Sequence, residues 1–175
     1  MLDSLITSKT RLKLLLKFFL NPENKAYLRS LETEFEESSN GIRVELNRLE
    51  QADMLKAVSE GNKKIYCVNT KHPLYGDINS IVRKYLGIDV LIENIVAGLG
   101  GLKQVYLIGK LADGLESNVI DLLFVGDLNL SYQQQIIAKA EKLLKKEIRS
   151  RNYAGDSDDL AQQLEGQSHL LLWSI

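Results

Sequence analysis

Residues 39–68, SNGIRVELNRLEQADMLKAVSEGNKKIYCV, decide how the first half of the chain folds. The first part of this stretch has apolar residues at helical spacing, namely Ile42, Leu46 and Leu49. That spacing predicts a helix over about Gly41–Ala52. The period then changes: Gly61 and Asn62 are turn residues, and Lys63–Val68 alternates as a strand does. A β-hairpin with a Gly-Asn tip is therefore expected after the helix.

Two further helices are expected before this segment. The first starts near Thr7 or Ser8 and runs to about Leu20, because Ser and Thr favour a helix N-cap and Asn21-Pro22 ends the pattern. The second covers about Tyr27–Phe35. Three helices followed by a hairpin is the winged-helix order. A linker helix over Tyr75–Leu86 follows, and we place the domain boundary after it, giving domains 1–87 and 88–175.

The stretch from Ser8 to Tyr75 resembles a winged helix-turn-helix domain of the ArsR-like type. This resemblance implies that the third helix enters the DNA major groove, where its N-terminal side chains reach base edges. Arg can bind guanine and Asn can bind adenine, whereas the wing lysines would contact the phosphate backbone. The candidate DNA-binding residues are Ser39, Asn40, Arg43, Asn47, Lys63 and Lys64.

Charge gives only modest support for nucleic-acid binding. Residues 1–88 carry 14 Lys and Arg against 11 Asp and Glu, a balance of +3, whereas residues 89–175 carry 8 against 12, a balance of −4. The second helix and the turn after it are acidic, with Glu32, Glu34, Glu36 and Glu37. Acidic side chains oppose docking on phosphates, so a winged helix that binds only protein remains an alternative.

The second half alternates strands and helices, which predicts a small α/β domain with a mixed sheet. The whole chain is therefore expected to have an α+β fold. The expected elements are a helix over Val90–Leu99, strands over Gln104–Ile108 and Val119–Val125, a helix over Ser131–Lys146, a strand over Ile148–Tyr153, a helix over Asp156–Leu164 and a strand over His169–Trp173.

Residues 105–127, VYLIGKLADGLESNVIDLLFVGD, resemble the core motif of minimal nucleotidyltransferase domains of the DNA polymerase β superfamily. That family has Gly-Ser after one strand, Asp-x-Asp on the next and a third carboxylate on a later strand. The resemblance implies two divalent ions held by these acids. This chain has Asp121 at the second aspartate, but Val119 at the first and Lys110 at the serine. The later strand, Ile148–Tyr153, contains no acid, so we expect a catalytically degenerate domain without metal or cofactor.

A weaker nucleotide pocket is one interpretation of what remains at this motif. Its candidate residues are Gly109, Lys110 and Asp121, with Lys110 acting as a point charge for phosphate. The alternative is that Lys110 and Asp121 form a surface pair of little energetic value.

Composition limits the remaining classes. The chain has 175 residues, 45% of them apolar and 26% charged, which is typical of a folded protein. Its single cysteine, Cys67, cannot form an internal disulfide, and no apolar run is long enough for a membrane span, so a cytoplasmic location is expected.

These patterns together predict a homodimeric transcriptional regulator that binds double-stranded DNA. Its second domain would serve sensing or assembly, with a nucleotide or small molecule as candidate effector, and the helix Tyr75–Leu86 is the candidate dimer surface. The rivals are an active nucleotidyltransferase acting on a protein or small molecule, and an antitoxin-like protein-interaction module.

Overall fold

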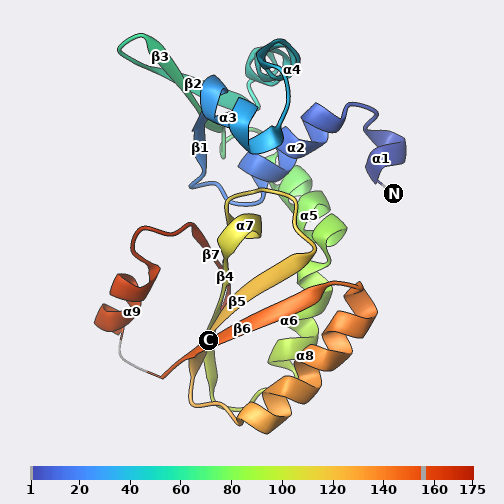
Figure 1. The fold of residues 1–175 in the computed structure, drawn as a ribbon, viewed down its shortest axis with the longest axis vertical. Helices are drawn as coiled ribbons and strands as arrows, with labels where there is room; N and C mark the ends of the chain where they lie inside the picture. Colours follow the sequence, from blue (N-terminus) through green and yellow to red (C-terminus); the bar gives the residue numbers. More distant parts are fainter. Residues whose placement is uncertain (1, 155–156) are drawn as a thin grey trace. The chain divides into compact units, whose positions relative to one another are not determined.

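The computed structural model describes residues 2–154 and 157–175. The chain divides into two compact units, Met1–Tyr85 and Leu86–Ile175, each with its own sheet. Figure 1 labels the elements of both units. The fold class is α+β, as the sequence predicts.

The first unit combines several helices with a three-stranded sheet. Its elements are α1 (Leu2–Leu5), α2 (Lys9–Phe19), β1 (Lys25–Tyr27), α3 (Leu28–Phe35), α4 (Ser39–Gln51), β2 (Leu55–Glu60), β3 (Lys63–Val68) and α5 (Tyr75–Leu86), the last of which ends in the second unit.

Amphipathic helices build the core of the first unit. α2 begins after Ser8, whose hydroxyl accepts a hydrogen bond from the Arg11 backbone at 3.2 Å and so satisfies a free N–H of the first turn. Apolar side chains from α2, α3 and α4 are fully or almost fully buried, including Leu12, Leu16, Phe19, Leu31, Ile42, Leu46 and Leu49. Burial of this stripe, more than intrinsic helix propensity, stabilises such short helices.

The sheet of the first unit has the order β1-β3-β2, and all its pairs are antiparallel. β2 and β3 form the expected hairpin, which projects beyond the helices (Figure 1). β1 was not predicted: Tyr27 pairs with Ile65 of β3, so α3 begins at Leu28 and not at Tyr27. This pairing fixes the base of the wing next to the start of α3.

The second unit contains a mixed sheet flanked by helices. Its elements are α6 (Ile88–Val96), β4 (Leu102–Ile108), α7 (Gly109–Ala112), β5 (Val119–Gly126), α8 (Leu130–Leu144), β6 (Glu147–Tyr153), α9 (Ser157–Leu164) and β7 (His169–Ser174). The strand order is β6-β5-β4-β7, with β5 and β6 parallel and the other pairs antiparallel. The expected helix start at Asp156 lies outside the described residues.

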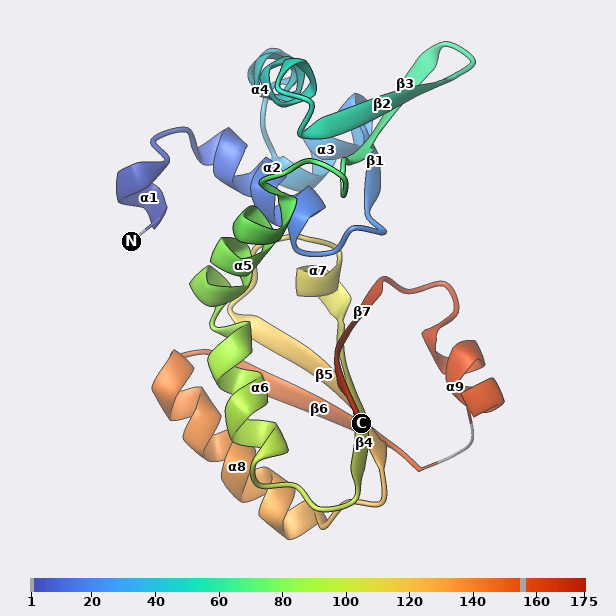
Figure 2. The same ribbon diagram turned by 180° about the vertical axis from the view of Figure 1, so that it is seen from behind.

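Both faces of this sheet are covered by helices within the second unit. α6 and α8 lie on one side, whereas α9 lies on the other (Figures 1 and 2). On the α9 side, Leu160 and Leu164 join Ile108, Leu123 and Val125 in one apolar cluster. Because side chains alternate along a strand, Asp121 shares the face of Leu123 and Val125.

Within residues 2–154 and 157–175, no helix has both the length and the apolar character needed to cross a bilayer.

Candidate nucleic-acid interface

The helix α4 presents a polar surface away from the core. It starts at Ser39, two residues before the expected Gly41, with Ser38 in extended conformation at the N-cap. Ser39 is half-buried, whereas the other three predicted contact residues on this helix are exposed, namely Asn40, Arg43 and Asn47. The polar face therefore begins at the first turn, where a DNA-reading helix approaches base edges.

A hollow of about 820 Å³ lies beside this helix. It is lined by residues from α4, from the start of α3 and from the wing: Tyr27, Leu28, Arg29, Ser30, Glu32, Arg43, Asn47, Asn62, Lys63, Lys64 and Tyr66. Four predicted DNA contacts, Arg43, Asn47, Lys63 and Lys64, come together here. Ser39 and Asn40 are not part of its lining.

Aromatic rings and a carboxylate hold the wing lysines in place. The Lys63 ammonium lies 5.6 Å from the centre of the Tyr27 ring, and that of Lys64 lies 6.0 Å from the Tyr66 ring. Lys64 also forms an ion pair with Glu50 at 3.3 Å. Both lysine side chains are exposed, so each contact contributes little stability, but together they keep positive charge beside α4.

Tyr27 connects the start of α3 to the hairpin. Its hydroxyl donates a hydrogen bond to Glu60 Oε2 at 2.7 Å. This hydrogen bond to the carboxylate is the main reason that the pKa of Tyr27 lies above its ordinary value, with burial and the charge of Glu60 adding to the effect. Tyr27 therefore stays protonated at neutral pH and remains a donor at the edge of the hollow.

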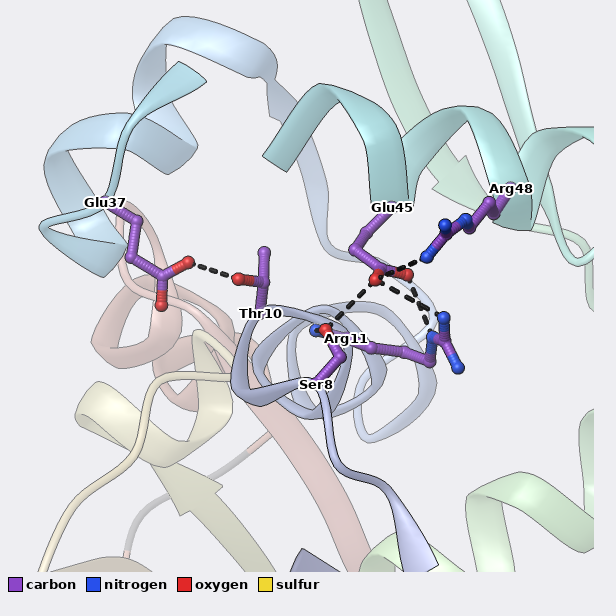
Figure 3. Close-up of polar contacts among 6 residues, drawn as sticks. All are labelled: Ser8, Thr10, Arg11, Glu37, Glu45 and Arg48. Carbon is purple, nitrogen blue, oxygen red and sulfur yellow. Dashed lines mark hydrogen bonds and ion pairs between the residues drawn. The ribbon is translucent and has the colours of Figure 1, made fainter. Parts of the chain in front are cut away.

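A nearly buried glutamate ties α4 to α2. Figure 3 shows Arg11 of α2 and the N-cap residue Ser8 reaching Glu45, while Arg48 reaches it from α4 itself. Arg11 Nε donates to Glu45 Oε2 at 2.8 Å, Ser8 Oγ donates to Oε1 at 3.0 Å and Arg48 Nη1 donates to Oε1 at 3.1 Å. Glu45 is 6% exposed. Its burial requires these partners, because a buried charge without them is strongly destabilising.

The same contacts set the protonation of Glu45. Burial alone would raise its pKa, but hydrogen bonds from Arg11 and Ser8, together with the two arginine charges, hold the pKa below the ordinary glutamate value. Arg48 forms an ion pair with Glu45, whereas Arg43 has no ion-pair partner among the described residues. The two arginines of α4 thus differ in their availability to a ligand.

Lysines of α2 pair with two glutamates of the acidic segment 32–37, whose negative charge would oppose DNA binding. Lys13 forms an ion pair with Glu37 at 2.7 Å, and Lys17 forms one with Glu34 at 2.7 Å. Thr10 also donates a hydrogen bond to Glu37, as Figure 3 shows. Burial would raise the pKa of Glu37, but hydrogen bonds from Lys13 and Thr10 hold it below the ordinary value. Two of the acidic residues therefore bind α2.

The second candidate site, in the other unit, has a different character. Gly109 follows β4 with φ +70°, and a Cβ added there would lie 2.8 Å from Asp121 Oδ2. Glycine therefore allows this turn to approach the Asp121 carboxylate closely. Asp121 is half-buried and Lys110 is exposed, and no ion pair joins them in the described part of the chain.

The strand β6, which pairs with β5 beside Asp121, carries one acidic and one basic side chain near it. β6 begins at Glu147, one residue before the expected start, so this strand does carry an acid, contrary to expectation. Glu147 pairs in register with Val119, and Arg149 pairs with Asp121. Arg149 Nε donates to Glu147 Oε1 at 2.8 Å, and this hydrogen bond raises the pKa of Arg149 above its ordinary value.

This donor set does not fit a pair of divalent ions. Val119, which has no oxygen donor in its side chain, lies where the motif has its first aspartate, and Glu147 is bound by Arg149. No group of three or more His, Cys, Asp or Glu residues able to hold a metal occurs within residues 2–154 and 157–175. Hard cations require several oxygen ligands, which this cluster does not supply.

Three residues that line the hollow were not predicted as site residues: Tyr27, Arg29 and Tyr66. Tyr66 belongs to the wing strand β3, whereas Tyr27 and Arg29 lie beside it because β1 pairs with β3. Arg29 is an exposed cation in the first turn of α3, and its charge was the only signal available.

Comparison with known proteins adds little to this picture. No family model matches the chain, and no curated protein matches it. Among solved structures, a mutant form of the toxin-antitoxin MntA-HpeT is 19% identical with a TM-score of 0.41, covering 50% of this chain and 73% of that one.

Two further structures are similar at the same level. Reduced HlyU from Vibrio cholerae is 16% identical with a TM-score of 0.37, covering 50% of this chain and 82% of that one. A protein of Archaeoglobus fulgidus is 17% identical with a TM-score of 0.39, covering 53% and 98%. TM-scores this low do not assign a function to the chain, so its function must be inferred from its own residues.

Proposed function

We propose that the chain is a transcriptional regulator that binds double-stranded DNA through its first unit. The observation that carries this proposal is the hollow beside α4, where Arg43, Asn47, Lys63 and Lys64 gather. A helix with exposed Arg and Asn suits the major groove, since these side chains bind guanine and adenine edges with paired hydrogen bonds. The wing lysines suit the adjacent phosphates.

The network around Glu45 supports this role. It fixes α4 to α2 through the Arg11 contact at 2.8 Å, so the outward side chains of α4 are presented from a rigid support. A site whose supporting residues are locked loses less entropy when it binds. Arg43 is available for contact, while Arg48 has a structural partner in Glu45.

The second unit, in this proposal, senses a ligand or supports assembly and does not transfer nucleotides. The carboxylates needed for two-metal chemistry are incomplete, with Val119 beside Glu147 and Asp121 beside Arg149. The turn at Gly109 with Asp121 and the exposed Lys110 is the candidate place for a phosphate-bearing effector.

Homodimerisation on paired half-sites completes the proposal, as is usual for regulators with one reading helix per copy. The candidate surface is α5, on which Ile81 is 48% exposed. Sedimentation equilibrium of the full chain would test this: a single species of the monomer mass at tens of micromolar would contradict it.

DNA binding is tested by fluorescence anisotropy on full-length protein, using duplexes selected from a random pool and several salt concentrations. We expect the logarithm of the affinity to fall linearly with the logarithm of salt concentration, since cations on the protein release counterions from DNA. Arg43→Ala should weaken binding to the selected site about tenfold.

Arg48→Ala is the matched control because it removes the same charge from the same helix. Its effect should be within about threefold, since Arg48 already binds Glu45. No binding at low salt, or equal losses in the two variants, would contradict the proposed mode of binding. Transfer of label from ATP in the presence of magnesium, abolished by Asp121→Ala, would instead support an enzyme. Capture of a protein partner without DNA binding would support an interaction module.

A further inference from the structure

The outward face of α4 carries one large apolar side chain among polar ones. Val44 is 42% exposed. At about 100° per residue, the side chains of Arg43, Asn47, Asn40, Gln51 and Val44 fall within an arc of about 100°. Val44 is therefore on the same face as the predicted base-contacting residues, at the opposite margin from Arg43.

Val44 lies outside the buried face of its helix. The buried face of α4 is formed by other residues: Ile42, Glu45, Leu46 and Leu49. A β-branched residue also lowers helix propensity relative to Ala or Lys at an exposed position. Arg48, one turn further along, directs its guanidinium to Glu45 (Figure 3).

An apolar side chain on a groove-facing helix has a specific complement in DNA. The thymine 5-methyl group is the apolar feature of the major-groove edge, whereas the other groups there are hydrogen-bond donors and acceptors. We propose that Val44 contacts a thymine methyl, in a site where Arg43 and Asn47 bind neighbouring bases. The ligand would be a duplex that has thymine close to guanine and adenine; this inference rests on the proposed function.

The test replaces each thymine of a selected duplex by deoxyuridine, which lacks only the methyl group. Affinities of the full chain are measured by anisotropy at one salt concentration. At one thymine we expect the replacement to weaken wild-type binding about threefold, the loss expected for one methyl group removed from an apolar contact. Val44→Ala should weaken binding to the thymine duplex by a similar factor and bind the thymine and deoxyuridine duplexes equally.

Val90→Ala is the control, because Val90 is also 42% exposed but lies on α6 of the other unit. It should keep the wild-type preference for thymine. Val44→Ala with an undiminished preference would overturn the inference. So would wild-type binding that depends on salt and sequence but is insensitive to every methyl group, and that result would leave the proposed function intact. Absence of any DNA binding would overturn both.

Discussion

The two units differ in how much of a functional arrangement their side chains retain. In the first, Arg43, Asn47 and two wing lysines come from separate elements and meet at one hollow. In the second, the turn at Gly109 approaches Asp121, but a valine, Val119, occupies the strand position where metal binding would need a second acid. The backbone pattern of each unit is visible in the sequence. The difference teaches that the chemistry must be judged from the individual side chains.

Removal of three positive charges from each unit should give the largest contrast. The triple variant Arg43→Ala, Lys63→Ala and Lys64→Ala should lose about a hundredfold in DNA affinity at moderate salt, because it removes base and phosphate contacts together. The matched variant Lys110→Ala, Arg149→Ala and Arg151→Ala takes the same charge from exposed positions of the second unit. Its affinity should change less than about threefold. Equal losses, measured by anisotropy, would remove the distinction between the units.

Substitution of Glu45 tests how much its hydrogen bonds to Ser8, Arg11 and Arg48 stabilise the first unit. Glu45→Ala should lower the free energy of unfolding of the first unit by about 2 kcal/mol, because Arg11, Ser8 and Arg48 all lose a hydrogen-bond partner. Glu50→Ala, in the same helix, removes only the exposed pair with Lys64 and should cost less than about 1 kcal/mol. Urea unfolding followed by circular dichroism measures both. Similar costs for the two variants would show that the network contributes little.

The pH dependence of stability should reflect the same carboxylate. The pKa of Glu45 in the folded chain lies below its ordinary value of 4.5, so its stabilising effect is present above that pH and is lost as the pH falls through the lowered pKa. Wild-type protein should therefore lose stability on acidification more steeply than Glu45→Gln, so that their difference shrinks below pH 4.5. A difference independent of pH would contradict this.

Introducing an acid at position 119 tests whether the second unit lacks metal binding because one carboxylate is missing. Val119→Asp would place two carboxylates at i and i+2 on the face of β5 that holds Asp121, next to Glu147 in β6. Millimolar magnesium should then stabilise the variant by about 1 kcal/mol while leaving the wild type unchanged. Thermal unfolding with and without magnesium measures this. Stabilisation of the wild type by the same amount would mean that its own ligands suffice.

The smallest expected effect concerns a single wing lysine. Lys63→Ala should weaken DNA binding about threefold, uniformly across sequences, and reduce the salt slope by about 1, as loss of one phosphate contact does. Lys142→Ala, at an exposed position of α8, is the control and should change neither quantity. A sequence-dependent loss for Lys63→Ala would indicate a base contact instead.

Periodic patterns predicted most helices and strands, but short or long-range features were not accessible from the sequence. The helical spacing of Ile42, Leu46 and Leu49 predicted α4, and the Gly-Asn turn predicted the hairpin. β1 is three residues long and exists because it pairs with β3, some forty positions away, which no local pattern reveals.

The residues of the hollow beside α4 were also predicted only in part. Charge and position on α4 identified Arg43 and Asn47, whereas Tyr27 and Arg29 join them through the pairing of β1 with the wing. Glu45 is buried at the margin of the apolar stripe of α4, and this burial was not predicted, because its partner Arg11 is distant in sequence. Similarly, the acid Glu147 was missed because the start of β6 is set by its pairing with Val119.

Mapping amide chemical shifts of the full chain during titration with a selected duplex is the most direct measurement. The proposed mode of binding predicts that the perturbed signals concentrate in α4, at the start of α3 and in the wing, with the amides of Gly109 and Asp121 unchanged. Perturbations centred on Gly109, Asp121 and β6, with the signals of α4 and the wing unaffected, would contradict it.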